Sequence, residues 1–395
     1  FERPEEDAQF APLANLEGEA LAIMKRLFNA PEEGCATFTS GGTESILVAM
    51  VSYLEMGKQK GIKPHFVFSE SLHPAFMKAA FYFDFEYSVA KNDENGRADN
   101  NEIIALIRKE TMAVCLSCVN YPHGIRDDIE GINAVLESRF PWVWIHVDGC
   151  LGGFSSCMSA HLDDGLIPVS DFRLSRVGTI SADNHKYGQS PKGCSTLMFR
   201  SADIKRAGLF AHVEGNRVYC NSTNASERTA AGSLGGWAAL RTLGLQGLVE
   251  DYKIVSGTVR ELCERLNASK DFQAYKQPHG CVFAIQMRSL PALTLFDVLS
   301  GLKKKSWSLQ MTQSPLVIHV TVSRHNAEQI RENLMSDLEE VMAEIHRNPK
   351  RKIQSFERTM YGTMLQIPDA RVVDETVKIM VMEFNKLSYE PQAFF

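Results

Sequence analysis

The sequence lacks any apolar run approaching the roughly 20 residues that a membrane-spanning helix needs. It also lacks a signal-peptide pattern, although the chain begins at Phe1 rather than at a methionine, which leaves open a targeting or anchoring segment outside it. No block of basic residues exceeds the lysines at 303–305, and the net charge is −6. These absences predict a chain without a membrane span of its own and without a nucleic-acid partner.

Paired metal-ligand motifs are missing as well. The chain has 9 cysteines, an odd number, spread over 395 residues, which does not fit a small disulfide scaffold. Cys115 and Cys118 form a C-x-x-C, but they lie inside the apolar run "MAVCLSCV", and no second C-x-x-C or histidine pair accompanies them. We interpret both as core thiols and predict no metal site. Unpaired cysteines also suit a reducing compartment.

A change of pattern divides the chain into two parts. Up to about residue 246, short apolar segments alternate with segments of helical periodicity, which favours a mostly parallel sheet with helices on both faces. Beyond that point a long helix is followed by three apolar segments and helices, the last of them amphipathic at 327–345. We predict an N-terminal segment at 1–33, a large α/β domain at 34–246 and a smaller α+β domain with an antiparallel sheet at 247–395.

Polar residues stand at the predicted ends of buried strands. Lys186 lies in "SADNHKYGQSPKG" (181–193), just past an apolar run, and Asp148 ends "WIHVD". Each has an ordinary alternative, because the lysine could be the first solvated residue of a loop and the aspartate a helix cap. Ligands of open α/β sheets bind outside the carboxyl ends of the strands, so both are candidate site residues.

Two further segments extend this constellation. "TSGGTES" (39–45) places small residues before a predicted helix, where exposed N–H groups and the helix dipole can hold a phosphate, although such a turn alone is weak evidence. His73 follows another predicted strand and alone would be an ordinary loop histidine. Together these features suit pyridoxal 5'-phosphate, which needs a lysine amine, a carboxylate for its ring nitrogen and a phosphate cradle. We expect desolvation and nearby cations to lower the pKa of Lys186.

Several longer motifs resemble one family. "SGGTES", "HVDGCLGGF", "DFRLSRVGTISADNHKYGQSPKG" and "AAGS" are similar to the sphingosine-1-phosphate lyase family, and "ISADNHKYGQSPKG" is the most specific of them. The family consists of fold-type I pyridoxal-phosphate enzymes related to the group II decarboxylases. The resemblance runs from about Gly34 to beyond Gly244 and continues weakly toward the C-terminus. It implies a mostly parallel large domain followed by a smaller α+β domain.

The resemblance also implies roles for individual residues. Lys186 would be the Schiff-base lysine, Asp148 would pair with the pyridine nitrogen and His73 would stack on the ring. The phosphate of the cofactor would be contacted by Gly42, Thr43 and His185.

Two further residues follow from the same resemblance. Lys192 would lie near the substrate phosphate or the scissile carbons. Ser233 would reach the cofactor of a partner subunit, because the family builds its sites across a homodimer interface. The segment after Ser233 is shorter than the family pattern, and no N-terminal tyrosine-bearing segment is recognisable before Gly34.

The implied reaction is a retro-aldol cleavage of phosphorylated sphingoid bases to a long-chain aldehyde and phosphoethanolamine. Its base could be Lys192, His185 or the cofactor phosphate. One alternative is a group II amino-acid decarboxylase, and another is a catalytically silent scaffold that kept the fold. The resemblance places the protein facing the cytosol, at the endoplasmic reticulum if an N-terminal anchor exists and in the soluble cytoplasm otherwise.

Overall fold

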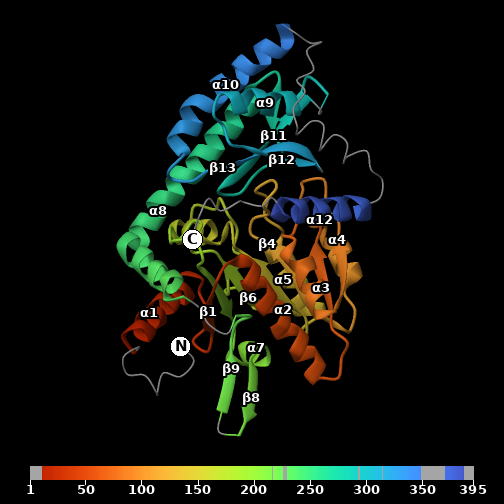
Figure 1. Ribbon diagram of the computed structural model, residues 1–395, viewed down its shortest axis with the longest axis vertical. Coiled ribbons are helices and arrows are strands. Elements are labelled where there is room, and N and C mark those ends of the chain that lie inside the picture. The colour runs from red at the N-terminus through yellow and green to blue at the C-terminus, as the bar shows by residue number, and fades with distance from the viewer. Residues whose placement is uncertain are drawn as a thin grey trace, which may run out of the picture.

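The computed structural model describes residues 11–215, 217–225, 229–291, 294–313, 315–347 and 370–386. Its larger part is built on a seven-stranded sheet in the order β1-β7-β6-β5-β4-β2-β3 (Figure 1). Neighbouring strands are parallel except at β7, which runs antiparallel to both β1 and β6. The strands are β1 (Cys35–Thr39), β2 (His65–Ser69), β3 (Glu86–Ala90), β4 (Thr111–Ser117), β5 (Trp144–Asp148), β6 (Val177–Ala182) and β7 (Ser195–Phe199).

Helices cover both faces of this sheet, which is why β4 and β6 are buried along their whole length. One apolar cluster packs α2, α3 and α7 against the sheet, and a second packs α1, α4, α5 and α6 against it. The mostly parallel sheet predicted from the sequence is therefore confirmed. The helices are α1 (Ala11–Leu27), α2 (Gly42–Gln59), α3 (Ala75–Phe83), α4 (Asn100–Leu106), α5 (Ile129–Arg139), α6 (Gly153–Leu162) and α7 (Ala202–Ala207).

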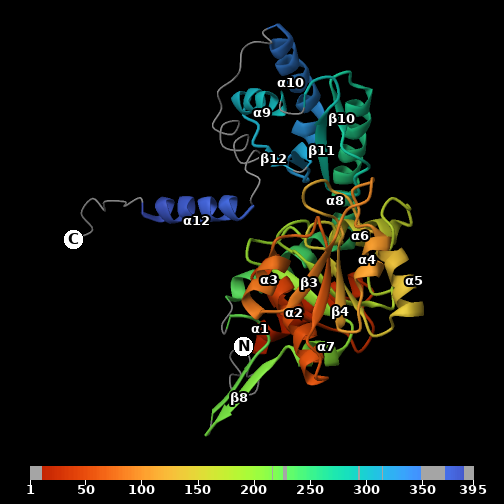
Figure 2. The same cartoon turned by 90° about the vertical axis from the view of Figure 1, so that its right-hand side faces the viewer.

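A smaller unit with its own apolar cluster follows (Figure 2). The long helix α8 (Ala230–Ala268) connects the two units and is interrupted at Gly244, whose backbone is not helical. The smaller sheet is antiparallel throughout, in the order β10-β11-β13-β12. Its elements are β10 (Phe272–Ala274), β11 (Val282–Met287), α9 (Leu295–Lys304), β12 (Gln310–Gln313), β13 (Leu316–Thr321) and α10 (Ala327–Arg347).

Several elements differ from the sequence-based expectation. The second of the three apolar segments expected after the long helix forms a strand, β12, only from Gln310, because the chain first turns after α9, where the Trp307 N–H donates to the Leu302 carbonyl. The hairpin of β8 (Phe210–Glu214) and β9 (Arg217–Asn221) was not predicted, nor was α12 (Ala370–Lys386). No helix in the described ranges is long and apolar enough to cross a membrane.

The loop after β4 joins the two units. The Gly124 carbonyl accepts a hydrogen bond from the His279 N–H at 2.7 Å, and the Pro122 carbonyl lies 3.3 Å from His319 Nδ1. Gly124 has φ +72°, and a Cβ there would lie 2.1 Å from the Val282 carbonyl oxygen. Only glycine fits this position, because the backbone is left-handed and β11 lies directly against it.

We expect Gly124→Ala to lower the free energy of unfolding by about 2–4 kcal/mol, since it adds a steric clash to left-handed strain. Gly165→Ala is the matched control, because Gly165 also has positive φ but no atom within 4 Å of an added Cβ, and it should cost about 1 kcal/mol. Urea denaturation of both variants measures the difference. Equal losses of unfolding free energy in the two variants would show that the contact with β11 does not restrict the residue at position 124.

Candidate active site

A cavity of about 1020 Å³ opens where the strands of the large sheet end and the smaller unit begins. The loops that follow β1, β2, β4, β5 and β6 supply most of its wall, as expected for an open α/β sheet. Thr321 and Ser323, at the end of β13, close it from the smaller unit. Of the residues predicted for the site, the wall contains Gly42, Thr43, His73, Asp148, His185, Lys186 and Lys192.

The start of α2 forms one side of the cavity. The Ser40 N–H donates to Glu44 Oε2 at 2.7 Å, which holds the glycine turn against the first turn of the helix. A Cβ on Gly42 would lie 2.7 Å from Cys150 Sγ and 2.8 Å from Asp183 Oδ1, so a larger residue cannot be accommodated there. Glycine therefore lets the helix start lie directly against the strand ends, where its N–H groups and dipole suit an anion.

Asp148 stands at the end of β5 and is buried in the cavity wall. Its Oδ1 accepts hydrogen bonds from the Cys150 N–H at 3.1 Å and from Ser181 Oγ at 3.4 Å. Ser181 lies beside it in the parallel pairing of β5 and β6. The carboxylate is thus oriented by its own strand end and by the neighbouring strand.

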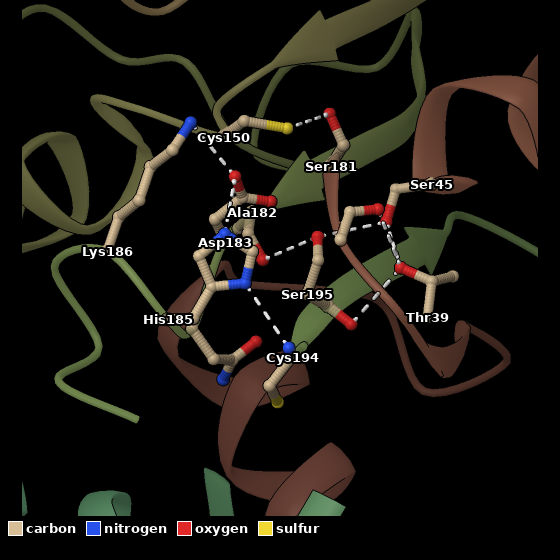
Figure 3. Close-up of polar contacts among 12 residues, drawn as sticks. Thr39, Ser45, Cys150, Ser181, Ala182, Asp183, His185, Lys186, Cys194 and Ser195 are labelled. Carbon is tan, nitrogen blue, oxygen red and sulfur yellow. Dashed lines mark hydrogen bonds and ion pairs between the residues drawn. The ribbon is translucent and has the colours of Figure 1, made fainter. Parts of the chain in front are cut away.

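Lys186 and His185 both point toward Asp183, in the turn that follows β6 (Figure 3). Lys186 Nζ lies 2.9 Å from Asp183 Oδ2, and His185 Nε2 lies 3.5 Å from the same oxygen. The Cys194 N–H donates to His185 Nδ1 at 3.2 Å. The proton of a neutral His185 therefore belongs on Nε2, directed at the carboxylate.

The charge state of the two basic residues differs. Burial, together with the charges of Lys192 and Lys186, lowers the pKa of His185 despite the opposing effect of Asp183, so its imidazole is neutral near pH 7. Burial also acts to lower the pKa of Lys186, but the nearby Asp183, Cys150 and Asp148 outweigh it and the pKa is raised. The expectation of a lowered lysine pKa was wrong, because the closest charge to the amine is a carboxylate and not a cation.

The remaining predicted residues occupy different positions. His73 is exposed at the cavity before α3, and its Nδ1 accepts from the Ala75 N–H at 3.1 Å. Lys192 is exposed at the cavity wall. Ser233 does not line the cavity of its own chain, and its Oγ donates to the Ala230 carbonyl at 3.3 Å inside α8. Its expected role concerns the site of a second copy.

Sequence reasoning missed several residues of the cavity wall. Asp183 stands three residues before Lys186 in the same motif, and its charge was the signal that could have marked it. Tyr121 follows a buried strand, so the strand-end argument used for Asp148 could have found it. Thr321 and Ser323 carried no such signal, because they come from the smaller unit.

The chain is similar to proteins of one known family over most of its length. The family model described as the pyridoxal-dependent decarboxylase conserved domain matches residues 8–284. The chain is 30% identical to sphingosine-1-phosphate lyase of Saccharomyces cerevisiae over 93% of its length and 63% of that protein. It is 31% identical to sphingosine-1-phosphate lyase 1 of Mus musculus, over 94% of the chain and 65% of the relative. The chain thus spans just under two thirds of the length of these two relatives.

Solved structures give the same fold. A sphingosine-1-phosphate lyase of Burkholderia pseudomallei superposes with a TM-score of 0.80 at 28% identity, over 90% of this chain and 81% of that one. A glutamate decarboxylase of Lactobacillus brevis superposes with a TM-score of 0.75 at 20% identity, over 88% of this chain and 83% of that one. The second likeness shows the fold alone.

Proposed function

The chain belongs to the pyridoxal-dependent decarboxylase family, and we propose that within it this protein is a carbon–carbon lyase. Its substrates would be phosphorylated sphingoid bases such as sphingosine 1-phosphate, cleaved to a long-chain aldehyde and phosphoethanolamine. The observation that carries the proposal is the gathering of Lys186, Asp148 and Lys192 around one cavity. The similarity to sphingosine-1-phosphate lyases supports the choice of substrate.

The residues of the cavity fit pyridoxal 5'-phosphate, the cofactor of this family. An amine, a carboxylate, an imidazole and the start of a helix face one space, and Gly42 leaves the helix start uncovered by a side chain. Lys186 would hold the cofactor covalently, and Asp148 would pair with its ring nitrogen. The phosphate would lie at Gly42, Thr43 and His185, and His73 would lie against the ring.

When bound, pyridoxal phosphate supplies an electron sink for charge that develops on the carbon beside the substrate amine. The chain's own residues then have separate tasks. Asp148, oriented by the Cys150 N–H and Ser181, would keep a proton on the ring nitrogen. Lys192 would bring a positive charge to the substrate phosphate, because a charge-assisted hydrogen bond is about twice as strong as a neutral one.

Cleavage also needs a base for the substrate hydroxyl. His185 is poorly arranged for that task, because its Nδ1 already accepts from the Cys194 N–H and its Nε2 carries the proton. It is better suited to donate a hydrogen bond from Nε2 to a phosphate. Since Lys192 would serve as the cation that binds the substrate phosphate, the cofactor phosphate is the remaining candidate among the three bases considered from the sequence.

An amino-acid decarboxylase is the second candidate, supported by the family model itself. Such an enzyme would need to bind a substrate carboxylate, and it would not need a cation that binds a substrate phosphate. Incubation with a phosphorylated sphingoid base and with a panel of amino acids separates the two functions. The lyase releases aldehyde, whereas a decarboxylase releases carbon dioxide; release of carbon dioxide alone would overturn the proposal.

Replacement of Lys186 tests its proposed role as the cofactor lysine. Lys186→Ala should keep the fold, because the lysine side chain is 34% exposed and stands in a turn, but it should lose turnover and covalent cofactor. Borohydride reduction of the wild-type protein followed by peptide mapping should place the reduced cofactor on Lys186. Lys192→Ala serves as the control and should still be labelled at Lys186. A reduced adduct on another lysine would contradict the assignment.

Replacement of Lys192 tests its proposed contact with the substrate phosphate. Lys192→Ala should lower kcat/KM for the phosphorylated sphingoid base by at least about tenfold, equivalent to ~1.4 kcal/mol, since a phosphate would lose its cationic partner. Lys192→Arg keeps the charge and should retain most of the activity. Steady-state kinetics of both variants, with covalent cofactor as the check on the site, measures this. Wild-type rates in Lys192→Ala would leave Lys192 as a loop residue without a part in the reaction.

A homodimer is the third element of the proposal. The hairpin of β8 and β9 projects from the body of the protein (Figures 1 and 2). It exposes Phe210 at 61% and Val213 at 66%. A two-stranded hairpin is marginally stable alone, and exposed apolar residues on it favour a covering partner. A second copy of this chain is that partner, which agrees with the role expected for Ser233.

Light scattering after gel filtration tests this assembly. The wild-type protein should have the mass of a dimer, and Val213→Asp should shift it toward the monomer, because a charge would be buried in the interface. Leu166→Asp, which changes another exposed apolar residue on the loop after α6, should remain dimeric. A Val213→Asp variant that is as dimeric as the wild type would exclude the hairpin from the interface.

A further inference from the structure

The carboxylate of Asp183 is almost completely buried, with 3% of its side chain exposed. Its Oδ2 forms the ion pair with Lys186 Nζ at 2.9 Å. Its Oδ1 is also buried and has no hydrogen-bond partner among the described residues. A buried carboxylate oxygen without a partner is costly and is rarely kept unless it has a task.

Close packing holds this carboxylate in place. It lies against the start of α2, since a Cβ on Gly42 would be 2.8 Å from Oδ1 and 3.0 Å from Oδ2. The positive end of the helix dipole favours an ionised carboxylate at that position. The Lys186 N–H also donates to the Asp183 carbonyl at 3.1 Å, so one tight turn fixes the lysine relative to the aspartate.

Other titratable groups surround the amine of Lys186. Asp148 and Cys150 face it from the end of β5, and Tyr121 faces it from the loop after β4. The thiol of Cys281 approaches from the smaller unit. His185 Nε2 lies 3.5 Å from the same Asp183 oxygen, and this imidazole is neutral near pH 7. Among the described residues, Asp183 is the only one whose carboxylate forms an ion pair with the Lys186 amine.

We propose that Asp183 is a positioning residue that holds Lys186 as an ammonium ion in the cofactor-free chain. Its carboxylate thereby sets the pH at which Lys186 becomes a nucleophile able to capture the cofactor. This inference rests on the proposed role of Lys186 as the cofactor lysine. It assigns to Asp183 a task distinct from that of Asp148, whose Oδ1 is engaged by the Cys150 N–H and Ser181.

Capture requires the ammonium ion to lose its proton. The neutral amine of Lys186 would then be the nucleophile toward the aldehyde carbon of pyridoxal phosphate, and one water would leave as the carbon–oxygen double bond is replaced by a carbon–nitrogen double bond. The proton can leave directly to solvent in the cavity, because the Lys186 side chain is 34% exposed.

Competitive labelling of the full-length cofactor-free protein with acetic anhydride across a pH series tests the inference. Only the neutral amine reacts, so quantifying the Lys186 peptide by mass spectrometry reports its charge state. Asp183→Asn should move the midpoint of Lys186 labelling to lower pH and raise its labelling at pH 8 about tenfold, since an opposing charge is lost. Uptake of pyridoxal phosphate should shift to lower pH in parallel.

The chain offers matched controls. Lys305 pairs with Asp337 at 2.8 Å elsewhere in the structure, so its labelling should not change and serves as an internal reference. Asp183→Glu keeps the charge and should retain a midpoint close to that of the wild type. Asp148→Asn removes a second carboxylate near the amine and should move the midpoint less than Asp183→Asn does.

Two results would contradict the proposed role of Asp183. An unchanged midpoint in Asp183→Asn, or a larger shift in Asp148→Asn, would overturn the inference. If circular dichroism shows that Asp183→Asn does not fold, Asp183→Ser is measured in its place against the same criterion. Reduced cofactor on another lysine overturns the proposed role of Lys186, whereas an unshifted midpoint with cofactor on Lys186 overturns this inference alone.

Discussion

Parallel pairing of the central strands is the constraint on which the candidate site depends. Strands that run in the same direction end at the same edge, and their register decides which residues meet there. Ser117, Asp148 and Ser181 lie side by side across β4, β5 and β6. Asp183 and Lys186 follow immediately in the turn after β6. A shift of one residue in β5 would turn Asp148 to the other face of the sheet.

The second constraint is close packing where α2 meets these strand ends. Because Gly42 has no side chain, the start of α2 lies directly against the Cys150 thiol and the Asp183 carboxylate. A Cβ at this position would clash with both groups. This arrangement places a helix dipole, a carboxylate and an ammonium group in one buried wall. Charges in such a place interact more strongly than at the surface, because water is largely excluded. The charge state of Lys186 is therefore a property of the packing.

The cavity is completed by elements far apart in the sequence. The loop after β4 contacts the smaller unit through Gly124 and Pro122, and the same loop places Tyr121 in the cavity wall. Tyr187, next to Lys186, donates a hydrogen bond to the Val322 carbonyl at 2.7 Å. The lysine turn is thus attached to the smaller unit. The shape of the cavity therefore depends on how these two units are packed together.

The mostly parallel sheet could be predicted from the sequence, as could the strand-end positions of Lys186, Asp148 and the glycine turn, because each adjoins an apolar run and parallel strands end at one edge. The hairpin of β8 and β9 was not predicted from the sequence. Apolar residues such as Phe210 and Val213 are exposed on it, so it lacks the alternation of buried and exposed residues by which a strand is recognised. Only the tertiary structure brought Thr321 and Ser323 to the cavity and made Asp183 the counter-ion of Lys186. The pKa of Lys186 was mispredicted for the same reason: it depends on distances and burial within the folded chain, which residue types and spacing do not contain.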